Sequence, residues 1–150
     1  MSFPRSDMMH RALALAIEAA RAGEVPVGAV IVHAGKIIAE GANRTRRDLD
    51  PTAHAEIVAI RAACSVLESD RLTDCELWVT LEPCAMCAGA IANARIARVV
   101  YAAPDPKGGG VDHGARVFAQ PTCHHRPEVL AGIGESAAAA VLKDFFLQRR

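Results

Sequence analysis

The chain has 150 residues, a length at which one domain can bury most of its apolar surface around a single core. Hydrophobic residues make up 51% of the chain and charged residues 23%, which excludes an intrinsically disordered protein. The 17 basic and 17 acidic residues cancel, so net charge gives no argument for a nucleic-acid partner.

Segments that would direct the chain to a membrane or out of the cell are missing from this sequence. No stretch approaches the roughly 20 apolar residues that span a bilayer, and residues 1–11 lack the apolar region of a signal peptide. We therefore expect a cytoplasmic protein with no membrane segment, folded as a single domain over residues 1–150. The five cysteines of such a chain are better suited to metal binding than to a disulfide framework.

Hydrophobic periodicity and turn residues predict helices that alternate with strands. In chain order, the expected elements are a helix over 7–22, strands over 25–32 and 36–39, a helix from 50–52 to about 67, a strand over 76–81, a helix over 83–94, a strand over 98–101, a weakly marked strand over 128–133 and a helix over 135–148. Strand, helix and strand over 76–101 imply parallel pairing, so the expected fold class is α/β. Residues 103–114 are rich in proline and glycine and predict a surface loop.

Three side chains have the chemistry of zinc ligands: His54 and the pair Cys84-x-x-Cys87. Three protein ligands are typical of catalytic zinc, because they leave one coordination position open. The two cysteines lie three residues apart at an expected helix start, where both can bind one ion. His54 lies near the start of another helix, and two helices that cross the same sheet edge could bring both starts to one point.

Glu56 is the candidate for proton transfer. Bound zinc lowers the pKa of a coordinated water to about 7, so hydroxide is available at neutral pH. A carboxylate beside that water can take its proton, pass it to a ring nitrogen and later protonate the departing ammonia. On an ideal helix, residues 54 and 56 point about 200° apart, so both can flank the metal only if it lies off the helix end.

Taken alone, the His-x-Glu motif and the Cys-x-x-Cys motif are each weak evidence for a catalytic metal site. A His-x-Glu pair is usually surface chemistry, and a Cys-x-x-Cys pair can be a redox motif or part of a structural zinc site. A structural site would usually have a fourth protein ligand. The two motifs in this order, on two helix starts separated by a strand, favour a catalytic metal site.

The His-x-Glu and Pro-Cys-x-x-Cys motifs resemble those of the zinc-dependent nucleobase deaminases. Residues 25–30, 50–56 and 80–90 are similar to segments of the bacterial tRNA-specific adenosine deaminases, and the similarity spans nearly the whole chain. This resemblance implies a three-layer α/β/α cytidine-deaminase-like fold, with a five-stranded mixed sheet flanked by helices. It also implies a homodimer with one zinc ion per chain, which hydrolyses adenosine to inosine at the wobble position of the tRNA anticodon loop.

The resemblance also implies substrate contacts. Asn43 matches a residue that hydrogen-bonds the flipped base, and Val27 is placed against that base, with Ala55 as a further substrate contact. Asp105 and Lys107 are expected near the ribose-phosphate chain of the anticodon loop.

The C-terminal end offers a second group of candidate RNA contacts. Phe146 could present a stacking ring, and Arg149 and Arg150 could contact phosphates of single-stranded RNA. The neighbouring Phe145 leaves the choice of ring open, because at least one of the two phenylalanines is expected in the core.

Two polar clusters have more than one interpretation. The arginines before the second helix would suit phosphates around a flipped nucleotide, or they could form a solvated loop. They are Arg44, Arg46 and Arg47. Cys123-His124-His125 invites a second metal site, but adjacent residues rarely chelate one ion well, and a structural or RNA-facing loop is the preferred interpretation.

Three functions remain open at this point. The first is an enzyme that modifies tRNA, and the second is a deaminase of free guanine, cytosine or a nucleoside such as cytidine, since the same zinc chemistry suits any amino-substituted heterocycle. The third is a binding subunit that keeps zinc for stability alone. The presence of Glu56 argues against the third.

Overall fold

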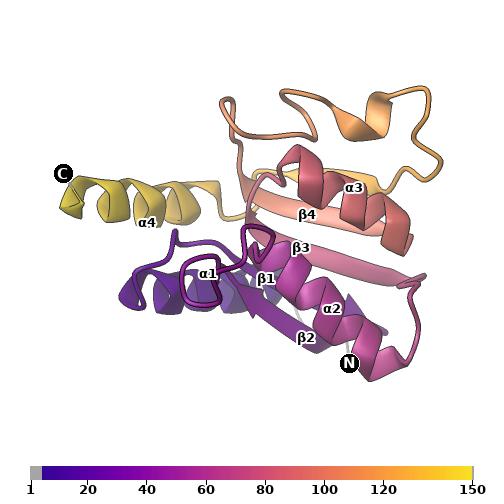
Figure 1. Cartoon of the computed structure of the whole chain (residues 1–150), viewed down its shortest axis with the longest axis horizontal. Coiled ribbons are helices and arrows are strands. Elements are labelled where there is room, and N and C mark those ends of the chain that lie inside the picture. Colours follow the sequence, from indigo (N-terminus) through magenta and orange to yellow (C-terminus); the bar gives the residue numbers. More distant parts are fainter. Residues whose placement is uncertain (1–4, 150) are drawn as a thin grey trace.

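The computed structural model describes residues 5–149 and has a five-stranded sheet between two layers of helices (Figure 1). The elements are α1 (Arg5–Arg21), β1 (Gly28–His33), β2 (Lys36–Ala42), α2 (Ala55–Leu67), β3 (Cys75–Leu81), α3 (Ala85–Ala94), β4 (Arg98–Ala103), the short 3-10 helix η1 (Val117–Ala119), β5 (Glu128–Ala131) and α4 (Glu135–Gln148). The predicted α/β/α layers and five-stranded mixed sheet are confirmed. None of the helices within residues 5–149 has the length and apolar content that a membrane crossing requires.

The order of the strands brings several chain ends to one edge of the sheet. The order is β2-β1-β3-β4-β5, with β1 antiparallel to β2 and β3, and β3, β4 and β5 parallel to one another. The ends of β2, β3 and β4 and the start of β1 therefore lie along the same edge, which we call the carboxyl edge. Ligand sites of parallel sheets form at such edges, where strands connect to helix starts.

Side chains alternate between two cores on the two faces of the sheet. Ile31, Leu77 and Val79 point toward α2 and α3, whereas Trp78 and Val100 point toward α1 and α4. Figure 1 shows α2 and α3 together on one face. The two helices that are expected to hold the metal are therefore anchored in one shared core.

The backbone of helix α2 packs directly against strand β2 of the sheet. Gly41 in β2 faces its backbone, and a Cβ atom at this position would lie 2.7 Å from the amide nitrogen of Ala59 and closer still to the carbonyl oxygen of Ala55. Any side chain at position 41 would therefore push the first turns of α2 away from the sheet.

Both helices of this face begin later than predicted. The sequence favoured a start at residues 50–52, but α2 begins at Ala55. The Asp50 carboxylate accepts hydrogen bonds from the Thr52 amide (2.9 Å) and hydroxyl (2.7 Å), which closes a turn in place of a first helical turn. As a result His54 is the N-cap of α2, and in the same way Cys84 is the N-cap of α3.

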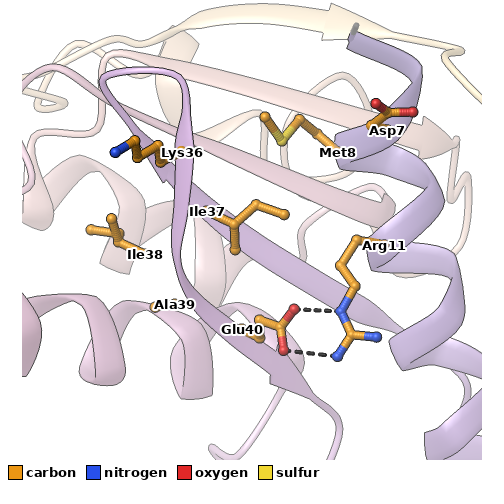
Figure 2. Close-up of a pocket in the computed structure, with 8 residues that line it drawn as sticks. All are labelled: Asp7, Met8, Arg11, Lys36, Ile37, Ile38, Ala39 and Glu40. Carbon is orange, nitrogen blue, oxygen red and sulfur yellow. Dashed lines mark hydrogen bonds and ion pairs between the residues drawn. The ribbon is translucent and has the colours of Figure 1, made fainter. Parts of the chain in front are cut away.

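A cavity of about 570 Å³ lies on the other face, between α1 and the edge strand β2. Figure 2 shows Ile37 and Glu40 of β2 pointing toward α1, where the Glu40 carboxylate accepts two hydrogen bonds from the Arg11 guanidinium. None of the candidate zinc ligands or substrate contacts lines this cavity.

Candidate metal centre and active site

His54, Cys84 and Cys87 meet at the carboxyl edge, at the starts of α2 and α3. The Nδ1 atom of His54 lies 3.6 Å from the sulfur of each cysteine, and the three donor atoms all lie within 4.8 Å of one another. A tetrahedral zinc site with bonds of about 2.0 Å to nitrogen and 2.3 Å to sulfur separates those donors by about 3.5 Å. The spacing and the chemistry of the donor set therefore fit zinc.

The cap positions explain how the three donors converge. His54 and Cys84 precede their helices with extended backbone, and Cys87 lies one turn into α3, above Cys84. The His54 side chain makes no capping hydrogen bond to its own helix, and the first helical amide, that of Ala55, donates to the Oδ1 atom of Asn43 at 2.8 Å. The imidazole is thereby free to face the sulfurs.

The two cysteines differ in their electrostatics. A hydrogen bond from the Cys87 thiol, with a further one from His54, lowers the pKa of Cys84 to about 4. The same bond, together with burial, raises the pKa of Cys87. One sulfur thus carries negative charge at neutral pH, which favours a cation between the two helix starts.

Glu56 lies in the first turn of α2 and is only 4% exposed. Burial raises the pKa of its carboxyl group to about 7. The difficulty that residues 54 and 56 point apart on a helix disappears, because His54 lies outside the helix as its N-cap. A zinc ion held by His54, Cys84 and Cys87 would supply a water whose pKa falls to about 7. The Glu56 carboxyl hydrogen-bonds Cys87 and therefore lies close to these donors.

A cavity of about 320 Å³ opens from the metal centre. It is lined by Val25, Val27, Asn43, Thr45, His54, Glu56, Leu81, Glu82, Cys84, Asp105 and Gly108. Of the substrate contacts expected from the sequence, Val27, Asn43 and Asp105 are brought together here, and Ala55 adjoins them through its bond to Asn43. Lys107 is exposed on the loop that follows Asp105 and is not a lining residue.

The C-terminal candidates lie elsewhere. Phe145 is buried, with 6% of its surface exposed, whereas Phe146 is 53% exposed, so the expectation that one ring belongs to the core is confirmed. The Arg149 guanidinium lies 4.3 Å above the ring of Phe145. Figure 1 shows the end of α4 extending beyond the sheet, away from α3. Arg150 lies outside the described residues.

The arginines of the segment before α2 mainly support their own loop. Arg44 pairs with Asp48, and Arg47 contacts Glu24, which also accepts hydrogen bonds from the backbone amides of Arg46 (3.2 Å) and Arg47 (2.8 Å). Burial by itself would raise the pKa of Glu24, but these hydrogen bonds outweigh it and the pKa is lowered. A buried carboxylate thus fixes the loop that presents Asn43 and Thr45 to the cavity.

The Cys123-His124-His125 segment does not form a second metal site. The thiol of Cys123 donates to the backbone oxygen of His125, whose ring nitrogen Nε2 bonds the backbone oxygen of Ile96 at 2.7 Å. Within residues 5–149, only the three residues at the starts of α2 and α3 form a cluster of metal-binding type.

Sequence reasoning missed several lining residues, of which Glu82 is the most informative. It lies between the apolar strand β3 and the Pro83-Cys84 motif and is 2% exposed. The available signal was one acidic residue between an apolar strand and a metal ligand.

The α/β/α sheet, the three-donor centre and the buried acid beside it are the features of a metal-dependent enzyme that activates water. The chain belongs to the family described as cytidine and deoxycytidylate deaminase zinc-binding region, which matches residues 4–103.

Individual relatives agree with this family. The chain is 53% identical to the tRNA-specific adenosine deaminase of Agrobacterium fabrum, over 97% of this chain and 96% of that protein. A structure solved in a study of A-to-I editing by tRNA:A34 deaminases matches with a TM-score of 0.91 and 54% identity, over 92% of this chain and all of that chain. The guanine deaminase of Nitrosomonas europaea matches with a TM-score of 0.82 and 25% identity, over 97% and 85% of the two chains.

Proposed function

We propose that this protein is a tRNA adenosine deaminase that converts the wobble adenosine of an anticodon loop to inosine, consuming one water and releasing one ammonia. The observation that carries the proposal is the cluster of His54, Cys84 and Cys87 beside a cavity that Glu56 and Asn43 also line. The high identity to a tRNA-specific adenosine deaminase over the whole chain supports the choice of substrate.

In this proposal Glu56 moves the protons. Its carboxylate accepts a proton from the attacking water and delivers it to the ring nitrogen next to the reacting carbon. It then takes the second proton from the new hydroxyl group and gives it to the amino group, so that the carbon–nitrogen bond breaks, ammonia leaves and the oxygen becomes the carbonyl of inosine. Burial of Glu56 supports this role, because a carboxyl group with a raised pKa can both accept and donate near neutral pH. His54, Cys84 and Cys87 hold the metal and take no proton from the substrate.

The remaining residues bind and orient the nucleotide. The side-chain oxygen of Asn43 accepts a hydrogen bond from the Ala55 backbone amide. The side-chain nitrogen of Asn43 therefore remains to donate a hydrogen bond to the base. Val27 offers an apolar contact to the face of the base. We assign Asp105 and Lys107 to the ribose-phosphate chain, and Phe146 and Arg149 to more distant nucleotides of the loop.

Three further proposals concern the protein as a whole. Residues 1–150 act as one deaminase domain, because a single sheet carries both layers of helices. The enzyme is a homodimer: Val66 in α2 and Met86 in α3 are 58% and 39% exposed, and a second copy could cover them. It works in the cytoplasm, where its proposed substrate is found.

The test is an assay of the purified, zinc-loaded protein on an anticodon stem-loop with adenosine at the wobble position. We expect inosine and ammonia in equal amounts, measured by nucleoside mass spectrometry and a coupled ammonia assay. Guanine, cytosine and cytidine are offered separately, because the likeness to a guanine deaminase makes a free base the second candidate. Turnover of a free base with an unmodified stem-loop would overturn the proposal.

A further inference from the structure

The carboxylate of Glu82 is buried next to the metal centre without belonging to it. Glu82 follows the last residue of β3 and is 2% exposed, and two residues later Cys84 begins the Cys-x-x-Cys pair. A carboxylate that is buried in this way is costly unless it is well hydrogen-bonded. Its partners therefore indicate what it stabilises.

All of these partners come from one irregular segment, residues 104–113, which we call the 104–113 loop. One carboxylate oxygen accepts from the amide of Asp105 (3.0 Å) and contacts Nδ1 of His113 (2.7 Å). The other accepts from the amides of Val111 (3.2 Å), Asp112 (2.9 Å) and His113 (3.1 Å). Five groups from both ends of the loop thus converge on one side chain.

The glycines of the loop allow this close approach. A Cβ atom on Gly109 would lie 2.5 Å from the carboxylate of Glu82, and one on Gly110 would lie 2.5 Å from the amide nitrogen of Ala85 at the start of α3. The Gly110 amide also donates to the backbone oxygen of Pro83 at 2.8 Å. The loop is therefore fitted around Glu82 and against the turn that carries Cys84.

This fit shapes one wall of the cavity above the metal centre. Asp105 and Gly108 line the cavity together with Val27 and Asn43. Asp105 is held from two sides, because its amide donates to Glu82 while its own carboxylate accepts from the amides of Lys107 (3.3 Å) and Gly108 (2.9 Å).

We propose that Glu82 is a positioning residue, whose carboxylate holds the 104–113 loop in the shape that binds the substrate nucleotide. The inference rests on the proposed function, because the loop acts on the substrate that the enzyme deaminates. Glu82 borders the cavity, but all of its side-chain hydrogen bonds go to the 104–113 loop and none to His54, Cys84 or Cys87. Its loss therefore weakens substrate binding and leaves the chemical step and the metal in place.

The first test compares Glu82→Gln with wild type and with the matched control Glu76→Gln, which changes a carboxylate on the same strand that pairs with Arg98 instead. For Glu82→Gln we expect the KM for the anticodon stem-loop to rise about tenfold, with kcat and zinc content within about twofold of wild type. Hydrogen exchange should quicken at the amides of Asp105, Asp112 and His113 and stay unchanged in α2 and α3. The control should keep the wild-type KM and the wild-type exchange in the loop.

A second pair of variants perturbs the contact between Glu82 and the 104–113 loop from the loop side. It tests the proposal even if Glu82→Gln does not fold. Gly109→Ala places a methyl group against the carboxylate and should give the same rise in KM and the same faster exchange. Gly89→Ala in α3, where a Cβ atom meets nothing within 4 Å, is the control.

The outcomes separate the two proposals. An unchanged KM with unchanged loop exchange in Glu82→Gln or Gly109→Ala would overturn the role of Glu82, as would loss of zinc and kcat at constant KM. A wild-type enzyme that fails to modify the stem-loop would refute the proposed function. Hydrogen exchange would still show whether Glu82 holds the loop.

Discussion

Substituting Gly41 by alanine tests how closely α2 must approach the sheet. The added Cβ atom would lie 2.7 Å from the Ala59 nitrogen. Ordinary contact needs about 3.5 Å, so α2 must retreat by roughly 1 Å. Overpacking of this kind costs about 1–3 kcal/mol of unfolding free energy. The shift also moves His54 at the start of α2. Because zinc–ligand distances tolerate deviations of only about 0.2 Å, the affinity for zinc should fall about tenfold.

The assay is urea unfolding of the metal-free protein, together with zinc competition against a chromophoric chelator. Gly89→Ala is the matched control, because a Cβ atom there meets nothing within 4 Å. Alanine is the better helix former, so Gly89→Ala should raise stability by about 0.5–1 kcal/mol. Replacing glycine by alanine should therefore lower the free energy of unfolding at position 41 and raise it at position 89. If Gly41→Ala is as stable as wild type and binds zinc equally well, the close packing of α2 does not position the metal centre.

Three further predictions concern the metal centre and a loop that adjoins it. Glu56→Gln should keep its zinc, measured by elemental analysis, and lose at least about 100-fold in kcat, because a proton carrier is removed and a ligand is not; a variant with full activity would exclude the proposed role. Cys87→Ser should lose both zinc and activity, because one of three ligands changes, and retention of stoichiometric zinc after dialysis would contradict this assignment. The Glu24 carboxyl has a lowered pKa in the folded protein, so its stabilising contribution is present above pH 4.5 and is lost as the pH falls through the lowered value. The difference in unfolding free energy between wild type and Glu24→Gln should therefore shrink from pH 6 to pH 3, and a constant difference would refute it.

The residues of the candidate metal centre were predictable because their identity and spacing are local properties. A histidine and two cysteines at expected helix starts could be read directly, and the structure brings His54, Cys84 and Cys87 together. The helix starts themselves were placed too early, by three to five residues for α2 and by two residues for α3. Asp50-Pro51-Thr52 satisfies its polar groups in a turn, and sequence propensity does not distinguish such a turn from a first helical turn.

The walls of the cavity were less predictable because they depend on contacts between distant residues. Glu82 is bonded by groups 23 to 31 residues further along the chain, and Glu24 by Arg46 and Arg47 after a complete hairpin. The hydrophobic periodicity of the sequence does not indicate which distant residues will bond to these carboxylates. The sequence leaves the arginine cluster open as a phosphate-binding surface or a solvated loop, and the folded structure adds that Arg44 pairs with Asp48 and Arg47 with Glu24.

The buried carboxylates of Glu24 and Glu82 serve a different purpose from that of Glu56. Helices α2 and α3, anchored in a common core, carry the residues of the reaction, whereas Glu24 and Glu82 each hold a segment without regular structure beside them. Positions of those segments that do not contact a helix start, unlike Asn43 and Gly110, could change without disturbing the helices, provided that each segment keeps its acidic anchor. New substrate preferences could therefore arise by exchanging loops on an unaltered reaction centre.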